Sequence, residues 1–319
     1  MPLFAVIQFP DIDPVLLHIW GPVAIRWYAL SYIAGIVLGW WHLRALITRP
    51  ALWSPLGVQG PIANKTQIDD FIVWATLGVL LGGRIGWIVF YELVKHPEEL
   101  VANPLRALYV WQGGMNFHGG LIGVILALIV FCRRNGIDPI RFGDGLACAV
   151  PFGLCFGRIA NFINAEIVGK VSDAPWAVIF CNARMKANNG GVCPPGLDSP
   201  RLPVQLYEAF LEGVVIFLIL VALTRFYKGL RRPGLAVGVF LIAYAAFRIF
   251  IEVMFRDSDN KLGGGWTLGI ALSLPMPIAG FLFLWNSFQD RLGPVPFAKT
   301  IAQLTGAGLA RSKTAGKPT

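Results

Sequence analysis

Charged side chains are scarce in this sequence. Asp, Glu, Lys and Arg make up 14% of its 319 residues, whereas 55% of the residues are hydrophobic. In a typical soluble domain about a quarter of the residues are charged, so the scarcity excludes an ordinary soluble domain and favours a membrane protein. The 11 Trp and 22 Phe suit aromatic belts at the two interfaces of a bilayer.

Acidic residues are the rarer charge, because 18 Asp and Glu stand against 27 Lys and Arg for a net charge of +9. In a membrane protein this excess sits mostly in cytoplasmic loops, beside anionic lipid. The sequence has no basic face interleaved with aromatic residues, so we expect no nucleic-acid partner.

Several catalytic motifs are also missing. The sequence has no GxSxG, no HExxH and no Cys/His cluster with ligand spacing, which speaks against a serine hydrolase and a metalloenzyme. We therefore expect no metal. There are no repeated halves with broken helices, as many transporters have. The first residues lack a positive n-region, so we expect no cleavable signal peptide.

Long apolar runs are what the sequence does have, and a membrane span needs about 20 such residues. The seven candidates are Val23–Ile47, Phe71–Leu93, Phe117–Cys132, Leu146–Ile163, Leu206–Thr224, Leu235–Phe255 and Trp266–Phe288. We expect an all-α polytopic membrane protein, with residues 1–292 as one transmembrane domain and 293–319 as a mobile cytoplasmic tail. GGMNFHGG, before the short third span, is expected to enter the membrane as a non-helical turn.

The basic residues of the loops predict the orientation. Fifteen Lys and Arg follow spans one, three, five and seven, and eight lie in the other loops, four of them in one long loop. Loops rich in Lys and Arg stay in the cytoplasm. The N-terminus is therefore expected outside, the C-terminus inside, and residues 166–203 in an extracytoplasmic lobe.

The five cysteines fall into two groups. Cys181 and Cys193 lie in the long outer loop, where an oxidising compartment would allow a disulfide; a pair of free thiols is the alternative. Cys132, Cys148 and Cys155 lie in or beside apolar runs and read as small core residues.

A polar group interrupts the fourth span in FGLCFGRIANFINAEIVGK, residues 152–170. A charged side chain at membrane depth costs at least about 2.5 kcal/mol, so it usually marks a functional site. Arg158 and Asn161 are three residues apart and share one helix face. The segment therefore predicts an arginine delivered to an anion. In the alternative, a bend near Asn164 lets Glu166 neutralise Arg158.

The sixth span contains YAAFRIFIE, with Tyr244, Arg248 and Glu252 at i, i+4 and i+8 on one face. Two arginines that converge on one cavity suit a phosphate, because a guanidinium binds it through a fixed fork. An Arg248–Glu252 ion pair with only a structural role is the alternative.

His118 lies in MNFHGGLIG, where three glycines clear space around its ring. A neutral imidazole there could accept a proton from a thiol or from water, although a lone histidine against an apolar run is often structural. Tyr28 and Tyr32 share a helix face, as catalytic groups or as ordinary belt tyrosines.

Two further charges stand in apolar surroundings. Arg84, in LGGRIGWIVFYE, lies among glycines and could approach either a lipid or a carboxylate such as Glu208 or Glu212. Glu208 itself is expected to be a buried ion-pair member that holds helices together. These residues together indicate a protein that handles an anionic, membrane-resident molecule with acid–base help.

At this point the chain resembles the prolipoprotein diacylglyceryl transferases of bacteria, from about Phe9 to Phe288. The matching motifs, in the family's order, are RWYALSY, LGGRIGWIVFYE, WQGGMNFHGGLIGV, FGRIANFINAEIVGK, QLYEAFLEGVV and YAAFRIFIEVMFR. The resemblance implies a seven-span inner-membrane enzyme with its N-terminus outside and no cofactor. It implies that the diacylglyceryl group of phosphatidylglycerol moves to the lipobox cysteine thiol of a preprolipoprotein, with release of glycerol 1-phosphate.

The resemblance also implies the site residues. The catalytic set is His118, Arg158, Arg248, Tyr28 and Glu252, and the phosphatidylglycerol-binding set is Arg158, Asn161, Glu166, Gly169, Tyr244 and Arg248. Residue types that depart from the family pattern stand at Ala165, Ile167, Val168, Lys170, Leu202, Val204 and Ile270. Two readings therefore stay open beside the transferase: a phospholipid- or anion-binding or transport protein, and a divergent member without activity.

Overall fold

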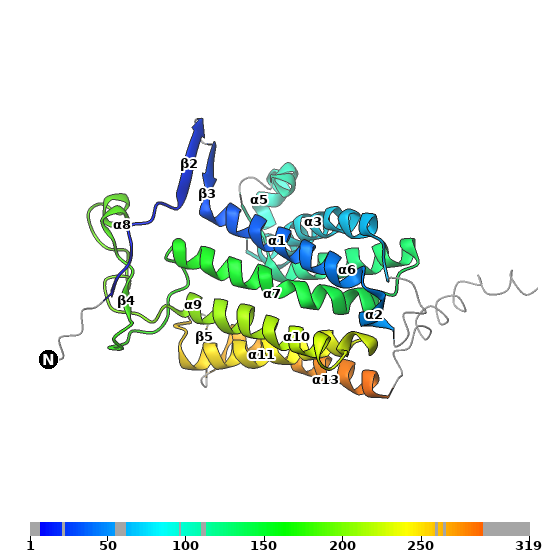
Figure 1. Cartoon of the computed structure of the whole chain (residues 1–319). Coiled ribbons are helices and arrows are strands. Elements are labelled where there is room, and N and C mark those ends of the chain that lie inside the picture. The colour runs from blue at the N-terminus through cyan, green and yellow to red at the C-terminus, as the bar shows by residue number, and fades with distance from the viewer. Residues whose placement is uncertain are drawn as a thin grey trace, which may run out of the picture. The chain divides into compact units, whose positions relative to one another are not determined.

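The computed structural model describes residues 7–20, 23–54, 62–95, 97–109, 113–258, 261–263 and 266–289. Within them, seven helical segments are long and apolar enough to cross a membrane, which agrees with the predicted all-α polytopic fold (Figure 1). They are Trp27–Ile47, Lys65–Glu92, Phe117–Asn135, Pro139–Ile163, Val204–Arg225, Leu235–Met254 and Gly269–Phe288. The expected tail, 293–319, lies outside the described residues.

The chain divides into two compact units. The first comprises Met1–His42 and Leu146–Arg291, and the second comprises Leu43–Gly145 and Leu292–Thr319. The division falls inside helix α1 (Trp27–Ile47) and inside helix α7 (Pro139–Ile163). The single transmembrane domain expected over residues 1–292 stays a prediction.

In the second unit, α3 (Lys65–Trp87) and α6 (Phe117–Asn135) touch backbone to backbone. A Cβ atom added to Gly119 would overlap the carbonyl oxygen of Gly82, and one on Gly123 would overlap that of Gly78. Glycine removes the side chains that would otherwise hold two helices apart in a membrane. The pair is therefore tightly fixed.

Local signals in the sequence set the ends of these two helices. Asn64 and Gln67 form a capping box at the start of α3, and Asn116 caps α6. Between the helices lie the π-helix η1 (Ile88–Glu92), α4 (Leu93–Lys95), α5 (Pro97–Ala102) and the 3-10 helix η2 (Pro104–Leu108). The short α2 (Pro50–Trp53) follows α1.

The first unit is built on long helices that run side by side, with α11 packed against α10 and α13 (Figure 1). Its helices after α7 are α8 (Ala183–Asn188), α9 (Val204–Glu208), the π-helix η4 (Ala209–Val215), α10 (Ile216–Arg225), the 3-10 helix η5 (Gly229–Arg231), α11 (Leu235–Met254), α12 (Leu268–Ser273) and α13 (Pro275–Phe288). In α1, Gly35 lets α7 approach, because its Cβ would lie 3.0 Å from the Cα of Gly153.

Short strands correct several predicted helix ends. The first span begins at Trp27 rather than Val23, because β3 (Val23–Arg26) pairs antiparallel with β2 (Val15–Trp20). The seventh begins after Trp266, because β6 (Trp266–Thr267) pairs with β5 (Lys261–Gly263) and Thr267 caps α12. The sixth span ends at Met254, one residue before the predicted Phe255. Only residues 113–116 of GGMNFHGG are non-helical, since α6 starts at Phe117.

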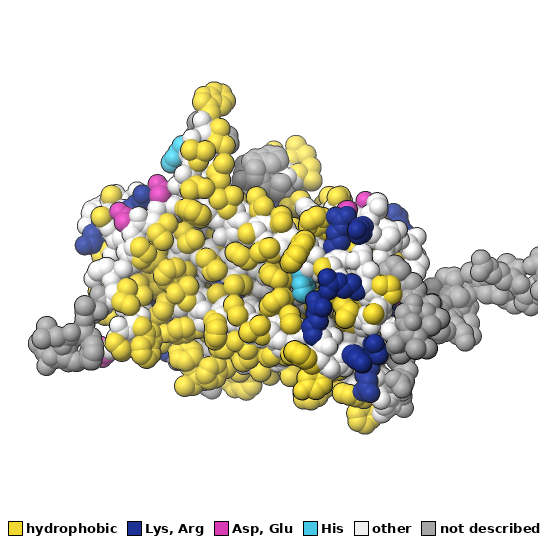
Figure 2. Space-filling model, viewed as in Figure 1, with side chains coloured by type: hydrophobic (Ala, Val, Ile, Leu, Met, Phe, Trp, Pro, Cys, Tyr) yellow, Lys and Arg dark blue, Asp and Glu magenta, His cyan; other side chains and the backbone are white. Residues whose placement is uncertain are grey.

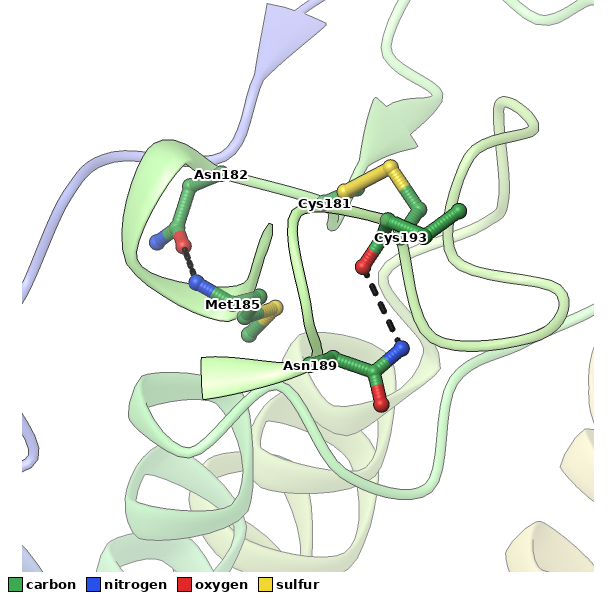
Figure 3. Close-up of a disulfide and its surroundings, with 6 residues drawn as sticks. Cys181, Asn182, Met185, Asn189 and Cys193 are labelled. Carbon is green, nitrogen blue, oxygen red and sulfur yellow. Dashed lines mark hydrogen bonds between the residues drawn. A yellow bond between two sulfur atoms is a disulfide. The ribbon is translucent and has the colours of Figure 1, made fainter. Parts of the chain in front are cut away.

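The predicted outer lobe contains the disulfide, which confirms one of the two alternatives for Cys181 and Cys193 (Figure 3). Asn182 caps α8 through the Met185 N–H, and Asn189 donates to the Val192 carbonyl. An apolar cluster buries side chains of the lobe together with Phe9 and Ala165, beside the parallel pairing of β1 (Ile7–Gln8) with β4 (Val178–Ile179). The buried members are Phe9, Ala165, Val178 and Phe180.

The outward faces of the spanning helices are apolar. Val37, Leu81, Leu218 and Phe281 lie on four different helices and are each exposed by half or more, and hydrophobic side chains cover much of the helical surface in Figure 2. In water such a surface would promote aggregation, whereas hydrocarbon is its natural solvent. The exposure pattern therefore agrees with a membrane location.

Candidate active site

A buried carboxylate, Glu208, lies at the centre of the first unit, where α9 passes into η4. Its side chain is 0% exposed. One oxygen accepts hydrogen bonds from Arg248 and from Arg256, the latter at 3.0 Å, and the other lies 3.3 Å from Nε of Arg158. Glu208 thus joins α7, α9 and α11, which confirms that it is a buried ion-pair member.

Two more carboxylates complete the ion network. Glu212 lies one turn after Glu208 and places Oε2 3.4 Å from Nη2 of Arg158. Glu252 places Oε2 3.0 Å from Nη2 of Arg248 and 3.5 Å from Nε of Arg256. Three arginines therefore face three glutamates. A balanced network of this kind is what makes buried charges tolerable, since removing one member leaves a charge uncompensated.

Glu252 is held firmly at its other oxygen. Thr267 donates to Oε1 at 2.8 Å, and Ser258 donates to the same atom. Gly269 leaves room for the carboxylate, because a Cβ there would lie 3.0 Å from it. The Arg248–Glu252 pair exists, but Arg248 also binds Glu208, so it is more than an isolated ion pair within one helix.

The two predicted arginines keep unused donors. Within the described residues, Nη1 of Arg158 and Nε of Arg248 contact no acceptor, and the two side chains are 18% and 13% exposed. Tyr244, half-buried, interacts electrostatically with both of them. Burial, and next the charge of Arg248, lower the pKa of the neighbouring Arg256, although Glu208 and Glu252 oppose the shift. Crowded guanidinium groups with spare N–H donors can bind a phosphate.

Beyond α7, the chain turns back on itself around Glu166. Asn161 donates to the Glu166 carboxylate at 2.9 Å, and Gln205 donates to its backbone carbonyl at 2.7 Å. Ala165 and Ile167 have φ of +55° and +60°, which is rare for residues with a Cβ and above all for a β-branched one. The alternative that Glu166 neutralises Arg158 is wrong, because Arg158 pairs with Glu208 and Glu212.

The segment that follows closes against the end of α11. A Cβ on Gly169 would lie 2.9 Å from the carbonyl oxygen of Phe255, so the backbones can meet only at a glycine. Lys170 donates through Nζ to the Val253 carbonyl at 2.6 Å. Lysine thus satisfies a carbonyl in the last turn of α11, where a positive charge also suits the helix dipole.

Tyr28 lies beside this group. Its hydroxyl is 3.2 Å from that of Tyr32, which confirms that the two tyrosines share a helix face. Tyr28 also interacts with the Asn161 amide and with the Glu166 charge. The structure therefore brings together Tyr28, Arg158, Asn161, Glu166, Gly169, Tyr244, Arg248 and Glu252 in one unit.

His118 belongs to the second unit, whereas the three arginines belong to the first. It lies in the first turn of α6, exposed, with its ring edge-on to Phe117 at 5.5 Å between centroids. Its imidazole has no hydrogen-bond partner within the described part of the chain. Arg84, in the same unit, donates from its guanidinium to backbone carbonyls, and no carboxylate among the described residues of that unit pairs with it.

Sequence reasoning missed Arg256, Ser258 and Thr267, which contact the glutamates of the ion network, and Gln205, which holds the Glu166 turn. Arg256 follows Glu252 by four residues and continues the i, i+4, i+8 series of the sixth span, so its spacing was a usable signal. The other three lie in a loop, in β6 and in α9, and no local pattern marks them. No group of His, Cys, Asp and Glu among the described residues could hold a metal ion.

Comparison with known proteins agrees with this picture. The family model for prolipoprotein diacylglyceryl transferase matches residues 14–286. The chain is 49% identical over 289 residues to the phosphatidylglycerol–prolipoprotein diacylglyceryl transferase of Allorhizobium ampelinum, covering 89% of this chain and 93% of the relative. It is 47% identical over 289 residues to the protein of that name from Phenylobacterium zucineum, covering 90% and 96%. The chain belongs to the prolipoprotein diacylglyceryl transferase family.

Proposed function

We propose that this protein transfers the diacylglyceryl group of phosphatidylglycerol to the lipobox cysteine of preprolipoproteins, the first step of lipoprotein maturation. The relatives that match this chain carry the name of that enzyme, and the match covers nearly their whole length. The observation that carries the proposal is the pair Arg158 and Arg248 on one buried glutamate, each with an N–H donor that contacts no acceptor among the described residues. The enzyme acts in the bacterial inner membrane, with its N-terminus and outer lobe facing away from the cytoplasm.

The reaction exchanges one bond for another. The cysteine thiolate forms a C–S bond to the terminal glyceryl carbon of the diacylglyceryl group, and the bond between that carbon and the phosphate oxygen breaks. Glycerol 1-phosphate leaves with the bonding electrons. The thiol proton must go to a base, since the thiolate is the nucleophile. His118 or a carboxylate of the site accepts it.

The arginines stabilise charge on the departing phosphate. Donors fixed in advance where charge develops stabilise a transition state without reorganisation. Glu208 and Glu252 hold Arg248 from two sides, so its free Nε–H keeps one direction. Glu252 acts as the orienting partner of Arg248 in this scheme, and Tyr244 borders the same space.

The turn around Glu166 forms the other part of the proposed lipid site. Asn161 directs its amide N–H at Glu166 and keeps its own oxygen for the glycerol head group. Tyr28 extends the row of hydroxyl and amide groups. Gly169 contributes by letting the loop close on α11. These groups suit the neutral hydroxyls of a glycerol head group better than its phosphate.

A transfer assay in nanodiscs tests the proposal. The substrates are phosphatidylglycerol and a lipobox peptide, with the Cys→Ser peptide as control, and the readouts are the mass gain of the peptide and released glycerol phosphate. We expect gain only with the cysteine peptide. Folded protein that binds the lipid but modifies no peptide would contradict the proposal and favour a lipid-binding protein.

Variants then test the site. Arg158→Lys and Arg248→Lys keep the charge but lose the fork, and we expect each to lower kcat by about 100-fold, as the loss of one fixed donor does. Lys186→Gln is the control, because this exposed residue of α8 lies outside the network. His118→Gln separates the two candidate bases: a rate near that of wild type assigns the proton to a carboxylate.

A further inference from the structure

Arg84 is a buried cation whose partners the sequence left open. It lies near the end of α3 with 6% of its surface exposed. Nε donates to the Ala107 carbonyl at 2.8 Å, Nη2 donates to that of Arg106, and Nη1 lies 2.6 Å from the Gly113 carbonyl and 3.1 Å from that of Gly114. No carboxylate pairs with it among the described residues. The guanidinium is therefore a clamp on backbone carbonyls.

The Arg84 guanidinium donates hydrogen bonds to two separate stretches of chain. Arg106 and Ala107 belong to η2, whereas Gly113 and Gly114 lead into α6. The two glycines have φ of +87° and +75°, a conformation that glycine adopts without strain. The side chain of Arg106 is held in turn by Glu92, 3.2 Å away and only 1% exposed at the end of the π-helix η1.

The start of α6 is tied to the same element. The Asn116 N–H donates to the Gly83 carbonyl at 2.9 Å, next to Arg84 in α3. The Asn116 side chain accepts from the Gly119 N–H at 2.9 Å and so caps α6. His118 is the second residue of that helix. The backbone position of His118 therefore depends on the contacts that Gly83 and Arg84 of α3 make with residues 113–116.

We propose that Arg84 is a positioning residue that fixes His118 for its part in the transfer reaction. The inference rests on the proposed function, in which His118 takes up a proton. Lysine cannot replace Arg84, because one ammonium on a flexible stem cannot hold carbonyls from two separate stretches in a planar fork. A small displacement of His118 matters even when the mutated residue lies away from the reaction, since a misplacement of about 1 Å can lower a rate about 100-fold.

The two glycines offer a matched pair of variants. Gly113→Ala and Gly114→Ala both force an alanine into the left-handed region. Only Gly114→Ala disturbs the Arg84 contacts, because its Cβ would lie 2.7 Å from Nη1 of Arg84 and 2.7 Å from the Trp87 ring. No atom of the described residues lies within 4 Å of a Cβ on Gly113. We expect kcat of Gly114→Ala to fall by about 100-fold with KM nearly unchanged, and Gly113→Ala to lose far less.

Arg84 itself is tested by Arg84→Lys and Arg84→Ala. Both should lower kcat in the same way, and added guanidinium ion should restore part of the rate of Arg84→Ala by entering the vacated clamp. Equal rates for the two glycine variants, or Arg84→Lys with the wild-type rate, would overturn the proposal. If Arg84→Ala does not fold, the glycine pair decides alone.

A spectroscopic readout separates this proposal from the proposed function. In protein labelled with ¹³C-histidine, His118 is assigned by its loss in His118→Gln. We expect its signal to shift in Gly114→Ala and Arg84→Lys, whereas His42, between the rings of Phe152 and Phe217 in the other unit, keeps its signal. If the His118 signal shifts in the variants but the wild-type protein has no transfer activity, only the proposed function is refuted. An unmoved His118 in both variants refutes the positioning role.

Discussion

Removing the disulfide should loosen the outer lobe and leave the helices intact. We consider the variant in which Cys181 and Cys193 are both serine. The two residues are 12 positions apart, and a cross-link over a loop of that length stabilises the folded state by about 3 kcal/mol in the chain-entropy model. Much of this stabilisation should act locally, because the cross-linked loop contains only α8 and its flanking turns (Figure 3).

The loss of stability in the lobe can be measured at single backbone amides through their hydrogen exchange. The Cys181 N–H is bonded to the Leu197 carbonyl and the Val178 N–H to that of Arg201, 2.9 and 2.8 Å away. If opening of the lobe becomes easier by about 3 kcal/mol, hydrogen exchange at these amides should speed up by roughly 100-fold. Amides in the middle of α11 should exchange at their former rate.

Hydrogen exchange by mass spectrometry in nanodiscs measures this effect, and Cys155→Ser is the control because that thiol is free and lies in α7. The transfer rate should also fall, since Ala165 of the Glu166 turn belongs to the same apolar cluster as Val178 and Phe180 of the lobe. Unchanged exchange in the double variant would show that the cluster alone holds the lobe. Faster exchange throughout the helices would show that the disulfide supports the whole unit.

The remaining predictions concern the ion network and the α3–α6 contact. Glu208→Gln removes the charge that faces three arginines, and we expect a loss of about 3 to 5 kcal/mol of stability, measured as a lower unfolding temperature in detergent. Glu98→Gln, at an exposed residue of α5, is the control. Equal unfolding temperatures of the two variants would contradict the central role of Glu208. Gly119→Ala should destabilise the protein and separate α3 from α6, because its Cβ would overlap the Gly82 carbonyl, whereas Gly120→Ala should be tolerated, since its Cβ would find its nearest neighbour 3.6 Å away. A melting scan compares the two alanine variants, and a larger loss for Gly120→Ala would refute the packing argument.

Local patterns predicted the spans and placed several residues of the candidate site on shared helix faces. Length and hydropathy placed seven helices, and a spacing of three or four residues placed Arg158 with Asn161 and Arg248 with Glu252 on shared faces. Both kinds of inference need only the helical repeat. The helix ends were less certain, because the pairing of Val23–Arg26 with an earlier strand is decided by β2 and not by the apolar run itself.

The partners of the charges could not be read in the same way. Arg158 pairs with Glu208 and Glu212, fifty or more positions along the chain, and Arg84 pairs with carbonyls, which every residue possesses. Spacing within a helix says nothing about which other helix will face it. The two left-handed residues beside Glu166 are equally hidden, since Ala165 and Ile167 are types that rarely adopt that conformation.

The ion network has a consequence for how the protein enters the membrane. Its charges lie on three consecutive spans: Arg158 on Pro139–Ile163, Glu208 and Glu212 on Val204–Arg225, then Arg248 and Glu252 on Leu235–Met254. A charged side chain left facing lipid costs about 2.5 to 3.5 kcal/mol on the insertion scale. Until α11 has been synthesised, the glutamates lack Arg248, so the segment from α7 to α11 should leave the translocon as one group. A nascent chain arrested before Arg248 should stay at the translocon or be degraded.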